Sequence, residues 1–147
     1  MTRISVSAEY DASPQEVWRA IEPIESHADW MADAEVIRFV TDQTRGVGTR
    51  FECVTVVGPV RLTDRMEVTE WEPGRSMGVR HDGIVTGTGT FTITPLDDGR
   101  RSRLAWDEEL RFPWWLGGPV GAPIGGAVLR RIWAGNLRRL ERRLPPS

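Results

Sequence analysis

The feature that most constrains the fold of this chain is its last long segment, residues 118–144, which reads GPVGAPIGGAVLRRIWAGNLRRLERRL. It begins with glycines and prolines and ends as a strongly basic stretch. Its apolar positions recur at multiples of four, with one further leucine filling the gap: Ile124, Val128, Ile132, Leu140 and Leu144, with Leu137. This spacing predicts a helix with one apolar stripe against protein and an arginine-rich face in water. Because everything upstream resembles short strands, we expect the helix to lie against a sheet, which it either fills or covers.

Length and composition set the class of protein. The 147 residues suit one domain spanning residues 1–147, and 39% hydrophobic with 27% charged residues is typical of a folded globular chain. No run of about 18 apolar residues occurs, and the N-terminus alternates like a strand, so we expect a cytoplasmic protein. The single Cys53 cannot form an internal disulfide, which agrees with that expectation.

Positive charge is concentrated near the C-terminus. Between Ala127 and Leu144 there are six arginines and one acid, Glu141, although the formal net charge of the chain is −2. We expect a solvated helix face, with weak contact to a membrane or an acidic partner as the alternative. No groove-reading motif or aromatic platform accompanies these arginines, so we expect no nucleic-acid partner. All 19 basic residues are arginine, which excludes chemistry based on lysine.

The rest of the chain predicts two short helices and a series of strands. Residues 3–10 alternate as a half-buried strand, and Ser13-Pro14 followed by Glu16 begins a helix that runs to about Ile21. A second short helix is expected around residues 24–29. Six further strands, separated by turn residues, are predicted over 34–41, 49–57, 60–71, 76–80, 84–95 and 101–112.

Strand parity assigns one face of this meander to the interior. With Pro73-Gly74 as a two-residue loop, residues 66–70 lie opposite 77–81, so that Glu70 faces Met77. Continued alternation gives the inward residues Leu62, Asp64, Met66, Val68, Met77, Val79, Val85, Gly87, Gly89, Phe91, Ile93, Leu104, Trp106, Glu108 and Leu110. At every turn, the alternation in the two flanking strands places the apolar residues on the same face of the sheet, which supports an antiparallel meander.

The order of these elements resembles the START-like superfamily, also called SRPBCC, which contains polyketide cyclases and dehydratases. The resemblance covers nearly the whole chain and is carried by the first strand with ASPQEVW at 12–18, the isolated Trp30, EWEPGR at 70–75, GTFTITP at 89–95 and SRLAW at 102–106. It implies an α+β helix-grip fold, in which a curved antiparallel sheet of about seven strands wraps a long C-terminal helix and a deep apolar cavity. Members bind lipids, sterols, polyketides or aromatic compounds, and some are enzymes or regulators of other proteins, so the fold narrows function only to a class.

The resemblance and the strand parity together predict the walls of this cavity. Apolar and aromatic walls with a few polar groups suit a hydrophobic small molecule, although the same residues could simply fill the core. The predicted ligand-binding residues are Phe51, Cys53, Met66, Val68, Met77, Val79, Phe91, Trp106 and Leu110 on the sheet, Trp30 and Trp115 near the openings, and Ile124 and Val128 on the helix.

Three titratable side chains are candidate catalytic residues. Asp64 and Glu108 point inward by parity, and a buried carboxylate needs a partner or a raised pKa. A neutral acid can donate a hydrogen bond to a carbonyl and an ionised one can accept a proton, with Glu108 the better candidate. The alternatives are a bulge that turns one outward or an arginine partner. His81 is the third candidate, although a histidine beside a turn is more often exposed, and the same holds for His27.

The spacing of the remaining residues excludes other kinds of site. Two distant histidines and one cysteine predict no metal site, and without a phosphate-binding loop or a nucleophile triad we expect no cofactor. The connector 112–119 holds two adjacent tryptophans and predicts either a hinge over the open end of the sheet or a portal that touches a membrane. Gly121, Gly125 and Gly126 remove side-chain volume beside it, so we expect the cavity mouth there.

Three functions therefore remain open. The first is a carrier or sensor that binds a hydrophobic or aromatic molecule in an apolar cavity with one polar end. The second is a cyclase or dehydratase, which requires at least two polar side chains to converge in one cavity. The third is a regulator of a partner protein, which predicts a filled core and an exposed apolar patch.

Overall fold

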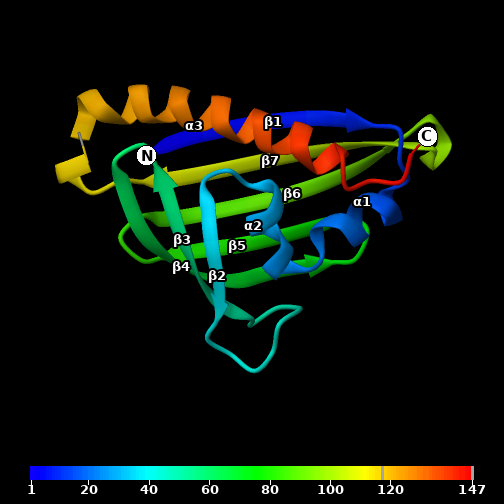
Figure 1. The fold of residues 1–147 in the computed structure, drawn as a ribbon, viewed down its shortest axis with the longest axis horizontal. Helices are drawn as coiled ribbons and strands as arrows, with labels where there is room; N and C mark the ends of the chain where they lie inside the picture. Colours follow the sequence, from blue (N-terminus) through cyan, green and yellow to red (C-terminus); the bar gives the residue numbers. More distant parts are fainter. Residues whose placement is uncertain (117, 147) are drawn as a thin grey trace.

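The computed structural model shows a seven-stranded antiparallel sheet that curves around one long helix (Figure 1). It describes residues 1–116 and 118–146, and the side chains of residues 1–115 and 125–146. The strands are β1 (Thr2–Tyr10), β2 (Ala34–Phe39), β3 (Arg50–Val57), β4 (Val60–Glu72), β5 (Ser76–Asp82), β6 (Thr86–Leu96) and β7 (Arg101–Arg111). The helices are α1 (Pro14–Ile21), α2 (His27–Trp30) and α3 (Gly118–Glu141), with 3-10 turns η1 (Ile24–Ser26), η2 (Asp97–Gly99) and η3 (Trp114–Leu116).

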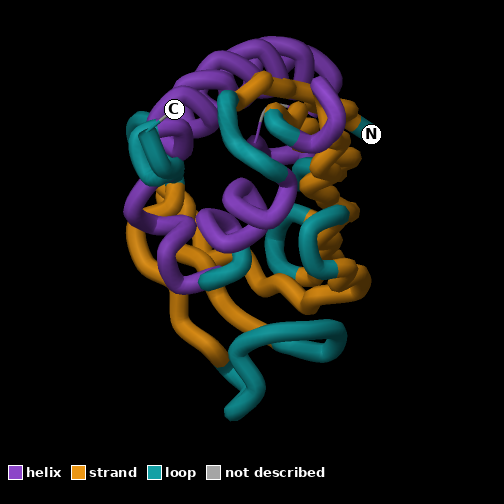
Figure 2. The backbone as a smooth tube through the Cα atoms, turned by 90° about the vertical axis from the view of Figure 1, so that its right-hand side faces the viewer, coloured by secondary structure: helices purple, strands orange, loops and turns teal. Residues whose placement is uncertain are grey.

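The strand order confirms the predicted helix-grip fold. Strands β2 to β7 form a meander, and β1 pairs with β7, which gives the order β1-β7-β6-β5-β4-β3-β2. Figure 2 shows α3 and the short helices on the concave side of the sheet. No helix in the described part of the chain has the length and hydropathy needed to cross a membrane.

Helix α1 begins where its sequence predicts. The Ser13 hydroxyl accepts from the Glu16 amide at 3.2 Å, and the Glu16 carboxylate accepts from the Ser13 amide at 3.0 Å. This capping box satisfies two amides that the first turn leaves without partners, and Pro14 has no amide proton to satisfy. The helix therefore starts sharply and buries Val17, Trp18 and Ile21 on the concave face, where it contacts β6 and β7.

The hairpin β4–β5 agrees with the predicted register only up to a β-bulge. Val68 lies opposite Val79, as predicted, but Glu70 pairs with Gly78 and Trp71 with Met77 because the register shifts between Val68 and Glu70. The prediction that Glu70 faces Met77 is therefore wrong. One extra residue in β4 places Trp71 against the core, 5.1 Å from Trp18 between ring centroids, where an acid would have lacked a partner.

Helix α3 presents most of the predicted stripe to the sheet. Leu137 and Leu140 are buried and Ile132 and Leu144 pack against the core, as predicted, whereas Val128 is 43% exposed and the side chain of Ile124 lies outside the described residues. A helix has 3.6 residues per turn, so each step of four advances about 40° around it. A series at strict multiples of four therefore leaves the buried face at its Val128 end, and Trp133, which lies outside the series, is buried.

The C-terminal end of α3 packs closely on the sheet. There the Tyr10 hydroxyl donates to the Leu137 carbonyl oxygen at 2.6 Å, and Leu104 and Leu140 are completely buried. This contact fixes the helix to β1 and leaves the N-terminal half of α3 over a less filled part of the sheet.

Candidate functional site

A cavity of about 350 Å³ lies between the concave face of the sheet and α3. Its volume falls in the range of about 300–1,000 Å³ that small-molecule pockets occupy. The predicted residues that line it are Phe51, Cys53, Met66, Met77, Val79, Phe91, Trp106, Leu110 and Val128, together with the candidate acids and bases Asp64, His81 and Glu108. The interpretation in which these side chains simply fill the core is therefore wrong.

Three predicted ligand-binding residues lie outside the described lining, and a fourth cannot be placed. Trp30 is 1% exposed and packs behind the cavity wall, with its ring 6.3 Å from that of Trp106, so its predicted place at an opening is wrong. Val68 is buried beside Ile24 in a second cluster of the core. Trp115 is exposed and is not part of the described lining, and the side chain of Ile124 is outside the described residues.

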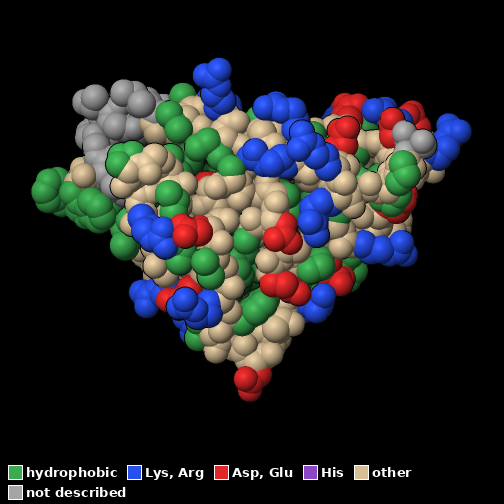
Figure 3. Space-filling view, in the orientation of Figure 1, with side chains coloured by type: hydrophobic (Ala, Val, Ile, Leu, Met, Phe, Trp, Pro, Cys, Tyr) green, Lys and Arg blue, Asp and Glu red, His purple; other side chains and the backbone are tan. Residues whose placement is uncertain are grey.

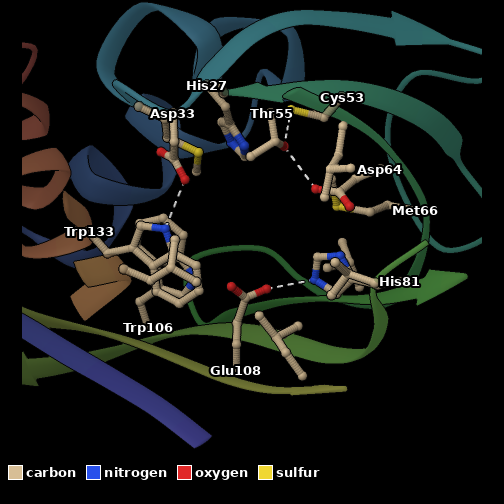
Figure 4. Close-up of a pocket in the computed structure, with 18 of the residues that line it drawn as sticks. His27, Asp33, Cys53, Thr55, Asp64, Met66, His81, Trp106, Glu108 and Trp133 are labelled. Carbon is tan, nitrogen blue, oxygen red and sulfur yellow. Dashed lines mark hydrogen bonds and ion pairs between the residues drawn. The ribbon is translucent and has the colours of Figure 1, made fainter. Parts of the chain in front are cut away.

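The central feature of the cavity is a buried pair formed by His81 and Glu108 (Figure 4). The Nε2 atom of His81 lies 2.6 Å from Oε1 of Glu108, and the two side chains come from β5 and β7. They meet above β6, where Gly89 lies opposite Glu108 and Gly87 lies opposite His81. A Cβ atom on Gly89 would lie 2.4 Å from Oε1 of Glu108, so glycine at this position is what permits the contact.

The pKa values of His81 and Glu108 are both raised above their ordinary values. Burial raises the pKa of the Glu108 carboxyl, and the His81 contact offsets only part of that effect. Burial would lower the pKa of His81, but its hydrogen bond and charge interaction with Glu108, together with the charges of Asp64 and Asp82, outweigh burial and raise it. The expectation that His81 is exposed beside a turn is wrong, because β5 continues to Asp82 and turns this residue inward.

Asp64 provides a second polar group in the same cavity. Its Oδ2 accepts from the Thr55 hydroxyl at 2.8 Å, and its Oδ1 is buried without a hydrogen-bond partner among the described residues. Burial raises the pKa of this carboxyl, and the Thr55 hydrogen bond opposes the shift. Neither Asp64 nor Glu108 is turned outward by a bulge or paired with an arginine, so the two alternatives considered for them do not apply.

Asp33 is a buried lining acid that the sequence analysis missed. Its Oδ2 accepts from Trp133 Nε1 and its Oδ1 from Asn136 Nδ2, both at 2.9 Å. Asn136 in turn accepts from the Ala32 amide at 2.9 Å. Asp33 therefore fastens the segment before β2 to α3. It lies in a connector, where strand parity says nothing about direction. On α3, Trp133 lies off the predicted stripe, and Asn136 lies on its spacing of four but is polar and was not counted in it.

His27 also lines the cavity, but it is held differently from His81. Its Nε2 donates to the Ile21 carbonyl oxygen at 2.7 Å, and its ring packs 5.3 Å from Trp30 and 5.9 Å from Phe91. Burial lowers the pKa of His27 to about 4, so the ring is neutral near pH 7. No three potential metal ligands among His, Cys, Asp and Glu come together in the described part of the chain.

The comparisons with known proteins identify the family. A family model described as polyketide cyclase/dehydrase and lipid transport matches residues 1–145. The chain belongs to this family. A search of curated protein sequences gives no match.

Solved structures of distant sequence share the fold of this chain. TTHA0849 from Thermus thermophilus aligns over 96% of this chain and 95% of its own, with a TM-score of 0.82 and 17% identity. The Zhui aromatase/cyclase from Streptomyces sp. R1128 aligns over 96% of this chain and 92% of its own, with a TM-score of 0.78 and 17% identity. A START superfamily protein from Mycobacterium smegmatis aligns over 98% of this chain and 97% of its own, with a TM-score of 0.77 and 14% identity. These identities establish the fold alone.

The described lining of this family member reaches solvent at one end. Val60, at the tip of the β3–β4 hairpin, and Val128, on the first half of α3, are its exposed members. Gly125 also lines the cavity, and a Cβ atom there would have no neighbour within 4 Å. The predicted position of the mouth near Gly125 agrees with this arrangement, while Gly126 approaches Thr2 and Gly121 has no described side-chain surroundings.

Proposed function

We propose that this protein binds a hydrophobic, partly aromatic small molecule in the cavity, with a carbonyl or hydroxyl group of the ligand against His81 and Glu108. The single observation that carries the proposal is a 350 Å³ cavity with mostly apolar walls and one buried acid–base pair. Membership of the polyketide cyclase/dehydrase and lipid transport family supports a hydrophobic ligand in general. The name of the Zhui aromatase/cyclase, a structural neighbour, favours an aromatic one.

The aromatic side chains of the cavity suit a flat ligand. Trp106 and Trp133 stack with ring centroids 4.6 Å apart and planes 10° from parallel, and Phe91 lies 5.0 Å from Trp106. Trp133 is held in this orientation by its hydrogen bond to Asp33. A planar ring can pack on such a preformed wall while its polar group reaches the acid–base pair.

The binding proposal is tested with 2-acetylnaphthalene, a flat apolar molecule with one carbonyl. Its titration should quench or shift the tryptophan fluorescence because Trp106 and Trp133 line the cavity. Replacing Gly125 with leucine fills open space in the lining and should weaken binding about tenfold or more. Ala127→Leu adds the same side chain at an exposed position of α3 and is the matched control.

Equal binding by the Gly125→Leu and Ala127→Leu variants would show that the ligand lies elsewhere. Naphthalene without the carbonyl group isolates the polar contact, and the proposal requires it to bind more weakly than 2-acetylnaphthalene because a buried hydrogen bond is lost. Native mass spectrometry of protein purified from its own host would identify the natural ligand.

A second candidate function is acid–base catalysis, favoured by the convergence of His81 and Glu108 in the cavity. On an aromatic β-hydroxyketone, the Glu108 carboxylate removes a proton from the carbon beside the carbonyl. The C–H electron pair forms the C=C bond, the C–O bond to the β-hydroxyl breaks, and the departing hydroxide takes a proton from protonated His81 and leaves as water. The proton on Glu108 then passes to His81 across their contact, which restores the pair.

Glu108→Gln separates catalysis from binding. The amide keeps the size and polarity of the side chain but cannot accept the substrate proton, so turnover should fall by about 10²-fold or more while binding persists. The formation of the enone absorbs in the near ultraviolet and measures turnover directly. No turnover by the wild-type protein on a series of aromatic β-hydroxyketones would favour a carrier or sensor.

The third class, a protein that only regulates a partner, predicted a filled core, and the cavity argues against it.

A further inference from the structure

Exposed apolar side chains gather at one end of the molecule. Met1, Val60, Ile84, Trp114, Trp115 and Val128 are six of the nine large hydrophobic residues exposed in the described chain. The strand register places them together: Thr2 lies opposite Leu110, Thr86 lies opposite Arg111, and the β3–β4 hairpin turns at Val57 and Val60. The other three, Val36, Val40 and Val47, belong to β2 and the loop after it. We call the first set the mouth end, because Val60 and Val128 also line the cavity opening.

The two tryptophans project farthest from the mouth end. Trp114 is 83% exposed and Trp115 is 54% exposed, both in η3 between β7 and α3. Figure 3 shows a hydrophobic knob on the left, where Figure 1 places this turn. A projecting knob needs a matching hollow in a rigid protein partner, whereas the soft headgroup region of a bilayer takes in tryptophan without one. Tryptophan is also enriched at that interface because its ring is apolar and its N–H is polar.

The charges around this knob suit an anionic surface. Arg111 precedes the tryptophans, and Arg130 and Arg131 lie on the exposed side of α3 shortly after Val128. None of the three arginines forms an ion pair with a described residue, and residues 112–129 contain no acid. The nearby Glu109 is already paired with Arg3.

The arginines near the C-terminus are less available than the sequence suggested. The Nε of Arg139 donates to the Trp30 carbonyl oxygen at 3.3 Å, and its second terminal nitrogen donates to Asn136 at 2.7 Å. Arg143 lies 3.8 Å from Asp29. These contacts favour the mouth end over the C-terminal arginines as the surface that meets an anionic partner.

We propose that the mouth end docks on an anionic lipid bilayer, with Trp114 and Trp115 in the headgroup region and Arg111, Arg130 and Arg131 near the lipid phosphates. Docking in this orientation places the cavity opening against the membrane. The surface does not depend on the ligand of the cavity, so docking can be tested on the protein without any ligand.

The test is sedimentation of the wild-type protein with vesicles of phosphatidylcholine and phosphatidylglycerol at 3:1, compared with phosphatidylcholine alone. Binding should require the anionic lipid and weaken with added salt. The Trp114→Ser/Trp115→Ser variant should bind about tenfold or more weakly, because two large apolar side chains no longer enter the interface. Val40→Ser/Val47→Ser removes two exposed apolar side chains from the loop after β2 and should bind like wild type.

The arginine contribution is tested in the same assay. Arg111→Gln/Arg130→Gln/Arg131→Gln should lose about fivefold in affinity per arginine. Arg75→Gln/Arg138→Gln, with both charges far from the mouth end, should lose much less. Absence of vesicle binding, or equal binding by the tryptophan variant and the wild type, would overturn the proposal. If sedimentation velocity shows a dimer that the tryptophan variant loses, and vesicles do not bind, the occupant of the mouth end is a second copy of the chain.

Discussion

His27 and His81 line the same cavity and are almost equally buried, at 7% and 8% exposed, yet their pKa values are shifted in opposite directions. His27 donates to the backbone carbonyl of Ile21, and its pKa falls to about 4. His81 lies 2.6 Å from the Glu108 carboxylate, and its pKa is raised.

The difference between the two histidines comes from their partners. Burial disfavours the charged ring in both, since a charge is poorly solvated in an apolar wall. A carbonyl oxygen can accept one hydrogen bond but supplies no full charge, whereas a carboxylate stabilises the imidazolium and opposes the effect of burial. His27 therefore acts as a neutral part of the wall, and the pair of His81 and Glu108 is where a proton can be given or taken. Three substitutions test this difference.

The largest expected effect is acid destabilisation through His27. The pKa of His27 is about 4 in the folded protein and 6.5, the ordinary value, in the unfolded chain. As the pH falls, the unfolded chain therefore takes up the proton first. The stability that neutral His27 contributes is complete above pH 6.5 and is lost towards pH 4, a change of about 3 kcal/mol. Urea unfolding at several pH values measures it. His27→Gln should remove this part of the pH dependence, and an unchanged slope would show that His27 is not held neutral.

The second change removes the space in which His81 and Glu108 meet. Gly89→Ala puts a Cβ atom 2.4 Å from Oε1 of Glu108, so the carboxylate must move away from His81. We expect a loss of about 1–3 kcal/mol in unfolding free energy and a lower pKa for His81, since it loses its charged partner. Gly125→Ala is the control, because a Cβ atom there has no neighbour within 4 Å. If Gly89→Ala left the His81 titration unchanged, the contact would not set its pKa.

The smallest expected effect is that of Glu108→Gln on how the free energy of unfolding depends on pH. The folded pKa values of Glu108 and His81 are both raised, so their contribution is complete below the ordinary values of 4.5 and 6.5. It is lost as the pH rises through the raised values. The stability advantage of wild type over the variant should therefore shrink by about 1–2 kcal/mol from pH 5 to pH 9. An advantage that grew with pH would contradict the assignment, and this slope is opposite in sign to that of His27.

Strand parity predicted the inner face of the sheet because side chains alternate strictly along paired strands. It placed Asp64 and Glu108 inside, and it also placed Gly87 and Gly89 there, which is the signal that could have predicted a contact across β6. Parity failed at the bulge in β4, which moved Trp71 to the core. At His81 the alternation from Met77 and Val79 holds, and the error was the expected end of the strand at residue 80, because β5 runs to Asp82.

Residues outside the strands were harder to predict. Asp33 and His27 lie in a connector and a short helix, where direction depends on packing against α3 and Phe91 rather than on local alternation. On α3, the buried face followed the 3.6-residue period, so Trp133 is buried although a spacing of four had left it outside, and Asn136, which lies on that spacing, was passed over because it is polar. Polar contacts between segments about 100 residues apart leave no local sequence pattern.

The most direct test of the account is nuclear magnetic resonance titration of the two histidine rings, with and without saturating 2-acetylnaphthalene. The chain has only two histidines, so each ring can be assigned with one variant. We predict that His27 stays neutral down to about pH 5, that His81 titrates above its ordinary value, and that the ligand raises the His81 pKa further because its carbonyl needs a proton donor. Two rings that titrate alike near pH 6.5, with no change at His81 on ligand addition, would contradict it.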